Sequence, residues 1–458
     1  MKKHISLLLI AALLPLLAAC GQSGLPTAPT STTVVEPTST RVQSTAPPKP
    51  RRTPTSEQVP TEAPTAIETP TTPGGEDEGL TDPLAIELQA IVEAGLPATP
   101  TPSGDNSGLG SFEGVWVMQI DTADGMGELW AAYTYGMRSF EPLEQHFVAV
   151  YSHEGGRWQE LDRAELEDPD YLDKTGVQQV AVEPENTWLQ VDSGVGAHGG
   201  CFNLLRFDGQ KLHNEVSHCN SAPGSGSLED LNGDDILDVL LDTTDHYVFC
   251  YACNVDYIST AVMRWDGSAM VDVQLEPLPD SAPEELRQLT DRAIELATHD
   301  LWKDAQATIA ETQRFNSQDE TYTWDAALIN LDANKRADHI QYSGYPLIST
   351  IFYGDYPPVL DVMRVYSVDE LFNPNSSFFT GTPAEGYIDF MTEYLTRTTT
   401  LQLDAMPDLA GAYFVRGWSL ALLDPKDPNA LADLQHAADL NSSESLFSDS
   451  LAYLKKQQ

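Results

Sequence analysis

Basic residues are scarce in this sequence of 458 residues. Lys and Arg number 25 against 69 Asp and Glu, which gives a formal net charge of −44 at pH 7. Residues 1–80 hold six of the basic and seven of the acidic residues, so nearly the whole excess lies beyond them. A nucleic-acid partner needs a basic face to meet its phosphates, and this composition excludes one. The charge suits instead a soluble body held off an anionic surface, and it suits divalent cations.

Long apolar runs are equally rare. Ile5–Leu17 is almost wholly apolar and carries no charge, but it is shorter than the ~20 residues that cross a bilayer. Lys2 and Lys3 precede it, and Leu17–Gly21 follows with small residues around Cys20. This order of a basic start, an apolar stretch and a small-residue cleavage site is typical of an export signal.

The cysteine at the cleavage point resembles the lipobox of bacterial lipoproteins. That resemblance implies that residues 1–20 are a signal peptide and that Cys20 receives the lipid. It further implies an extracytoplasmic protein, anchored by lipid to a bacterial membrane, since several acyl chains hold a protein firmly to a bilayer. The sequence leaves open which membrane and which leaflet.

Cysteine is also rare. Apart from Cys20 the chain has four, and an even number in an exported domain predicts disulfides. Cys201 and Cys219 flank an expected hairpin and form the first pair to consider, while Cys250 and Cys253 could close on each other. The connectivity stays open. A four-thiolate zinc site is the rival interpretation, but the 18-residue gap and the single Cys-x-x-Cys do not favour it.

Composition divides the chain into segments. Residues 21–111 are rich in Pro, Thr and Ser and predict a disordered linker, with a short helix near 82–96. Residues 112–280 predict a β-rich repeat domain, because short β-type runs alternate there with Gly and Asp turns. Residues 281–320 predict a helical hairpin, residues 321–370 a second β segment, and residues 371–458 a helical region. The fold class is therefore α+β.

A repeated motif lies within the β-rich text. Leu205–Gly209 matches Met263–Gly267, 58 residues later, and Ser152–Trp158 is a looser copy. The two closer copies are an aromatic strand entering an Asp-Gly hairpin turn. A period of this length predicts a propeller-like or sandwich-like array, with the number of repeats left open.

The helical end resembles a tetratricopeptide repeat. Tyr413, Gly417, Ala430 and Ala437 fall near that family's signature positions, with one residue inserted. Such repeats are usually protein-binding scaffolds. A solenoid needs about three stacked repeats, so a local helical hairpin that covers the β core is the alternative.

An oxygen-rich loop carries the most specific chemistry. Side-chain oxygens fall at positions 1, 3, 5 and 9, and the backbone carbonyl of Ile236 serves at position 7; the side chains are those of Asp230, Asn232, Asp234 and Asp238. Calcium takes six to eight such hard ligands from one tight loop. The loop resembles those of FG-GAP and VCBS repeats, which implies a calcium-stabilised β-repeat. The competing interpretation is an acidic turn without metal.

A weaker copy of this loop follows 100 residues later. It has the same spacing, with candidate ligands Asn330, Asp332, Asn334 and Asp338. Asn at positions 1 and 5 lowers its charge, and Lys335 lowers its expected affinity further.

Together these features predict a non-catalytic, calcium-stabilised interaction or scaffold module at the cell surface, with a protein or a glycan as partner. The alternative is an exported, glycan-directed hydrolase that uses a pair of carboxylates. No catalytic signature supports the alternative, so we expect no enzymatic activity.

Overall fold

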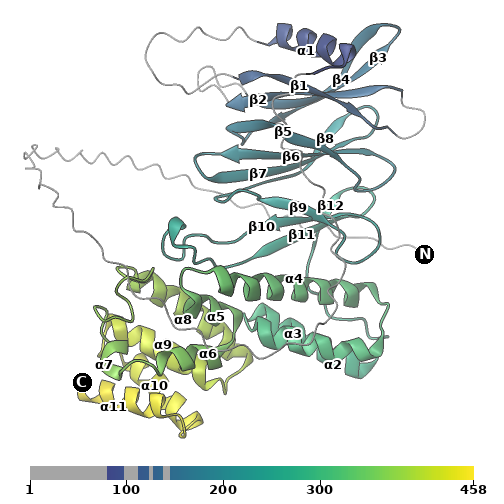
Figure 1. Ribbon diagram of the computed structural model, residues 1–458. Coiled ribbons are helices and arrows are strands. Elements are labelled where there is room, and N and C mark those ends of the chain that lie inside the picture. Colours follow the sequence, from purple (N-terminus) through teal and green to yellow (C-terminus); the bar gives the residue numbers. More distant parts are fainter. Residues whose placement is uncertain (1–79, 97–111, 123–126, 138–144, 458) are drawn as a thin grey trace, which may run out of the picture. The chain divides into compact units, whose positions relative to one another are not determined.

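The β-rich part of the chain consists of three consecutive four-stranded antiparallel meanders, β1–β4, β5–β8 and β9–β12 (Figure 1). Their strands are β1 (Phe112–Ile120), β2 (Leu129–Met137), β3 (His146–Glu154), β4 (Arg157–Leu166), β5 (Tyr171–Val180), β6 (Thr187–Val195), β7 (Gly199–Phe207), β8 (Leu212–Asn220), β9 (Gly226–Glu229), β10 (Asp238–Asp242), β11 (Thr260–Trp265) and β12 (Met270–Val273). Backbone pairing of Gly136 and Met137 with β5 joins the first two meanders into one eight-stranded sheet, while the third is a separate sheet.

This computed structural model describes residues 80–96, 112–122, 127–137 and 145–457. The predicted signal peptide, Cys20 and most of the predicted linker lie outside the described residues. The described part of the linker holds α1 (Pro83–Gly95), where the sequence predicts a short helix. Asp82 caps it, because its carboxyl accepts a hydrogen bond of 2.8 Å from the Leu84 amide.

The meanders stack face to face, so inner strands such as β2, β3 and β7 are buried on both sides. In β3, Val148 and Val150 pack against the second meander, while Phe147, Ala149 and Tyr151 face away from it. Such strands appear in the sequence as continuous apolar runs and not as an alternation of apolar and polar residues. The first two meanders therefore share one core.

The second and third meanders share another core. Trp188 of β6 is fully buried there and meets Trp265 of β11 edge to face at 5.0 Å between ring centroids. Side chains alternate along β7, so that Leu204 faces the third meander and Leu205 the first, and the register shift beside them places one extra residue in β8. One strand thereby serves both cores.

The repeated motif has the same place in each meander. Leu205–Gly209 and Met263–Gly267 end the third strand and enter the hairpin to the fourth, as the looser copy does between β3 and β4. In the two closer copies the aspartate side chain accepts hydrogen bonds from turn amides two and three residues ahead, at 2.8–2.9 Å. Asp208 and Asp266 thus fix these turns.

Ten α-helices follow the third meander in the described part of the chain. They are α2 (Glu284–Thr298), α3 (Trp302–Glu311), α4 (Glu320–Tyr342), α5 (Pro346–Tyr353), α6 (Tyr356–Met363), α7 (Val368–Leu371), α8 (Ile388–Ala405), α9 (Ala410–Leu423), α10 (Pro428–Leu440) and α11 (Ser445–Gln457). In the pair α9–α10, a Cβ atom on Gly417 would lie 2.9 Å from the carbonyl oxygen of Ala430, so glycine permits the close approach. The protein is therefore α+β, with a β-rich part and a helical C-terminal part.

Helices cover both ends of the stack. The α1 side chains Ala85, Leu88 and Val92 pack on the outer face of the first meander. Trp324 of α4 packs with Leu240 and Val262 on the outer face of the third meander. Apolar sheet faces that further repeats would otherwise bury are thus covered by helices of the same chain.

The β segment predicted for residues 321–370 is wrong. These residues form α4, α5, α6 and α7. A short apolar run such as Ala327–Ile329 does not distinguish a buried strand from a buried helix. Asp319 favours the helix locally. Its carboxyl accepts a hydrogen bond from the Tyr322 amide at 3.2 Å and caps α4, a helix of 23 residues.

Candidate functional site

The oxygen-rich loop connects β9 to β10 at one end of the third meander. Two residues take a positive φ, Gly233 at 78° and Asp235 at 65°, which lets the chain curl within six residues. The Asp230 carboxyl accepts from the amides of Gly233 at 2.7 Å and Asp235 at 3.0 Å, and Asp234 accepts from the Ile236 amide at 2.9 Å. The predicted side chains therefore belong to one tight turn.

Asp238 anchors this loop from the start of β10. Its side chain is buried, and one carboxyl oxygen accepts from the Leu231 amide at 3.0 Å. The pKa of Asp238 is raised to about 6, chiefly by burial and also by the nearby charges of Asp234 and Asp230, while the Leu231 hydrogen bond opposes the rise. Three carboxylates thus lie close enough to repel one another, and a cation would relieve this repulsion.

The donor chemistry fits calcium better than a softer metal. Asp and Asn side chains with a backbone carbonyl offer only hard oxygen ligands. Within the described residues, no group of three or more His, Cys, Asp and Glu side chains is arranged to hold a metal ion. The loop carboxylates accept loop amides instead, so calcium binding at Asp230, Asn232, Asp234, Ile236 and Asp238 remains a prediction.

The second predicted calcium loop does not exist as a loop, because its residues lie in α4. Asn330 and Asn334 are one helical turn apart, and both accept from the side-chain amide of Gln306, at 3.3 and 2.8 Å. Asp332 faces β11, where it hydrogen-bonds the Thr260 hydroxyl, and Asp338 is exposed. A helix turns about 100° per residue, so alternate residues diverge and these four cannot surround one ion.

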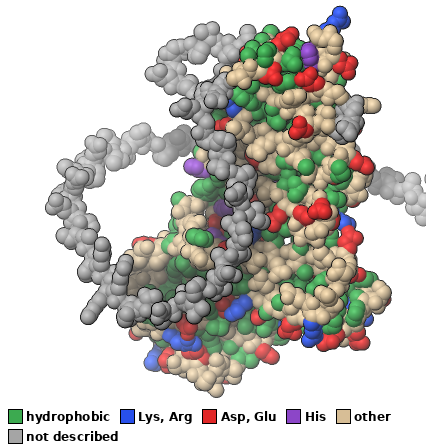
Figure 2. All heavy atoms as spheres, turned by 45° about the vertical axis from the view of Figure 1, so that its right-hand side comes forward, with side chains coloured by type: hydrophobic (Ala, Val, Ile, Leu, Met, Phe, Trp, Pro, Cys, Tyr) green, Lys and Arg blue, Asp and Glu red, His purple; other side chains and the backbone are tan. Residues whose placement is uncertain are grey.

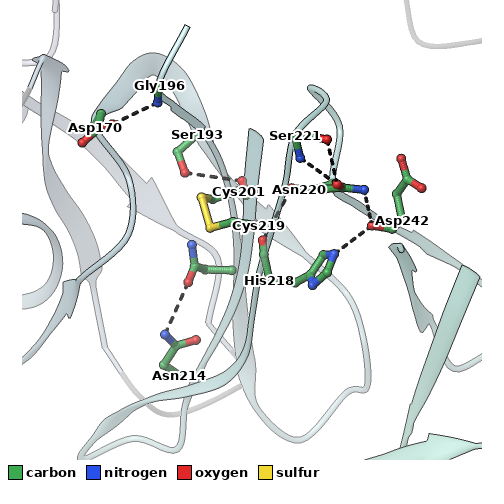
Figure 3. The surroundings of a disulfide bond; sticks show 12 residues. Asp170, Ser193, Gly196, Cys201, Asn214, His218, Cys219, Asn220, Ser221 and Asp242 are labelled. Atoms are coloured by element: carbon green, nitrogen blue, oxygen red, sulfur yellow. Dashed lines mark hydrogen bonds between the residues drawn. A yellow bond between two sulfur atoms is a disulfide. The ribbon is translucent and has the colours of Figure 1, made fainter. Parts of the chain in front are cut away.

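Both disulfides that the sequence suggested are present. Cys201 lies directly opposite Cys219 in the β7–β8 hairpin, with Cα atoms 4.0 Å apart (Figure 3). Beyond it, His218 and Asn220 of β8 both contact the Asp242 carbonyl of β10, at 2.8 and 2.7 Å. The hairpin thereby ties the second meander to the third. All four sulfur atoms are used, which excludes the zinc alternative.

The second disulfide, Cys250–Cys253, lies in a long loop between β10 and β11. We call residues 243–259 the docking loop, because Val248, Phe249 and Val255 are buried in the core of the helical part. Tyr257 donates from its hydroxyl to Asp300 at the end of α2. The loop therefore fixes the third meander to the helices.

The docking loop contributes to a group of histidines and carboxylates. His246 lies 3.2 Å from Asp256 and 3.6 Å from Asp242, and His339 of α4 lies 3.7 Å from Asp256. Burial lowers the pKa of His339, although Asp256 opposes this effect. The sequence analysis missed this group, because it is assembled from β10, the docking loop and α4.

A cavity between the third meander and the helices was missed as well. It has a volume of about 350 Å³ and is lined by Thr260, Ala261 and Val262 of β11, Asp272 and Val273 of β12, Gln274, Leu275, Trp302 of α3, and Leu328 and Asp332 of α4. Burial raises the pKa of Asp332. No local sequence signal marks such a cavity, because it is made by the contact of elements that are distant in sequence.

No protein-family model matches the chain, and no curated protein matches it. Inference about function therefore depends on the residues and their arrangement. None of the helices in the described part of the chain is both long and apolar enough to cross a bilayer.

Proposed function

We propose that this protein is an extracytoplasmic lipoprotein, anchored through Cys20, that serves as a non-catalytic, calcium-stabilised interaction or scaffold module. The observation that carries the proposal is the β9–β10 loop, where Asp230, Asp234 and Asp238 converge at the start of a β-repeat. Calcium there would replace carboxylate repulsion by coordination.

Three further features agree with this proposal. The two disulfides suit an oxidising, extracytoplasmic compartment. Acidic side chains are spread over the face shown in Figure 2, on strands and helices alike, and not gathered into one catalytic patch. The helical part exposes apolar side chains such as Val365 and Phe390, which a protein or a glycan, the proposed partner, could contact.

Thermal melting of the full-length chain tests the calcium component. Millimolar calcium should raise the melting midpoint relative to chelator, and Asp234→Ala should abolish the rise. Asp235→Asn is the matched control, because it removes one charge from the same loop at a non-ligand position, and asparagine tolerates the positive φ. An unchanged midpoint in the parent, or an equal loss in the control, would refute calcium binding by this loop.

Cell fractionation tests the anchor. The parent should label with radioactive fatty acid and sediment with membranes, whereas Cys20→Ser should do neither. Release of reducing sugar from polysaccharide by the purified chain would favour the hydrolase alternative over a non-catalytic module.

A further inference from the structure

The cavity under the third meander continues into a second one. The second has a volume of about 190 Å³ and shares Asp272, Val273 and Gln274 with the first. The two form one cleft, which we call the β12 cleft. β12 is the edge strand of its sheet. Cavities of this combined size accept small organic ligands.

Carboxylates are distributed along the β12 cleft. Asp332 lines the first cavity, Asp272 lies where the two cavities meet, and Glu276 and Glu320 line the second. Only Glu320 is paired with a basic residue that also lines the cleft, Arg264. A ligand in the cleft therefore meets negative charge at several points along its length.

Apolar walls separate these carboxylates. In the first cavity they are Val262, Leu275, Leu328 and the indole of Trp302. In the second cavity the indole of Trp324 forms the apolar wall. Carboxylates separated by aliphatic and aromatic walls match a molecule whose positive charges are separated by methylene groups.

Asp332 has an unused acceptor. Its Oδ1 is buried without a hydrogen-bond partner. The charges of Arg336 and Lys335 lower the pKa of Asp332, but their polar groups have other partners: Lys335 donates to Thr260 at 2.9 Å, and Arg336 lies over the rings of Trp302 and Tyr257. Neither lines the cleft. A buried acceptor without a donor is costly, and a ligand N–H would satisfy it after a small rotation of the carboxyl.

We propose that the β12 cleft binds a linear alkyl diamine or polyamine, with one ammonium group at Asp332 and another near Asp272 and Glu276. A neutral apolar ligand would leave Asp332 Oδ1 unsatisfied. An anion would be repelled by the cleft and by the net charge of −44, which attracts cations to the whole surface. The proposal is independent of calcium and of the lipid anchor.

Isothermal titration of the full-length chain with spermidine tests the proposal. Spermidine should bind at one site, 1,4-diaminobutane more weakly and n-butylamine more weakly still, because each step removes an ammonium group or methylenes. The diol 1,4-butanediol has the diamine's length without its charge and should not bind. Equal binding of the diol and the diamine would overturn the proposal.

Variants separate the cleft from general attraction to an acidic protein. Asp332→Asn should raise the spermidine dissociation constant about tenfold, as the loss of a charged hydrogen bond does. Asp338→Asn removes the same charge from the exposed side of α4 and should change it less than about twofold. Asp272 is exposed, so Asp272→Asn should leave the stability of the fold unchanged. This variant should also raise the spermidine dissociation constant, because Asp272 lines the cleft. Equal constants in Asp332→Asn and Asp338→Asn would show that the amine binds through net charge alone and would overturn the proposal.

Discussion

A Cβ atom on Gly344 would lie 2.0 Å from the carbonyl oxygen of Cys253. The Gly344 amide also donates to the Asn254 carbonyl at 2.7 Å, so the turn after α4 lies directly against the docking loop. This contact couples the β-repeats to the helices through backbone atoms, which cannot move aside as a flexible side chain can.

Gly344→Ala should therefore weaken the attachment of the docking loop. We expect a loss of about 1–3 kcal/mol in the free energy of unfolding, as for other overpacked sites, measured from the urea midpoint. Gly95→Ala is the control, because no atom lies within 4 Å of its added Cβ. If both variants unfold at the same urea concentration, the contact does not constrain the loop.

The two disulfides should contribute unequally. Cys201–Cys219 spans 18 residues and Cys250–Cys253 only three. Loop entropy predicts a contribution of about 3 kcal/mol for the first and about 2 kcal/mol for the second. The double alanine variant of Cys201 and Cys219 should therefore have the lower urea midpoint. The reverse order would mean that the docking loop depends on its disulfide more than on its buried side chains.

Local chemistry allowed part of this fold to be predicted. The Asp-Gly turns at Asp208 and Asp266 fix hairpins within five residues, and Cys201 and Cys219 flank one of those hairpins, so both features are visible in the sequence. Asp230 to Asp238 likewise lie in one turn. Where a feature is set by neighbours in the chain, the sequence pattern predicts it.

Tertiary contacts set the rest. The oxygen spacing of Asn330 to Asp338 matches a calcium loop, yet a cap at Asp319 and the burial of Ile329 and Ala333 against other helices make it part of α4. The β12 cleft joins Asp272 to Asp332, 60 residues apart, and only the packing of α4 on the third meander brings them into one cavity. The spacing of residues along the chain predicts neither the helix at Asn330 to Asp338 nor the cleft.

Asp325 should make stability depend on pH. Its side chain is buried in α4, its Oδ1 accepts from the Glu276 amide at 3.0 Å, and its Oδ2 has no partner. Burial raises its pKa from 3.8 to about 7, with smaller contributions from the charge of Glu276 and other acidic groups. The folded state therefore holds this proton more tightly than the unfolded state, so stability is fully present below pH 4 and falls as pH rises through 7.

Asp325→Asn should remove this fall. We expect the free energy of unfolding of the variant to exceed that of the parent at pH 8 by an amount on the order of 2–4 kcal/mol. Near pH 4 the two free energies should be equal. Urea midpoints at both pH values give the difference, with Asp338→Asn as the exposed control on the same helix. Parallel pH dependence in parent and variant would assign the proton uptake to another group.

Asp238 gives the calcium proposal a pH signature. Calcium needs the ionised carboxylate, whereas burial raises the pKa of Asp238 to about 6. Protons should therefore compete with the metal below pH 6, and the apparent calcium affinity should be about tenfold lower at pH 5 than its plateau above pH 7. Calcium titrations of the melting midpoint at pH 5 and pH 7.5 measure this. A calcium effect of equal size at both pH values would place the ion on carboxylates other than Asp238.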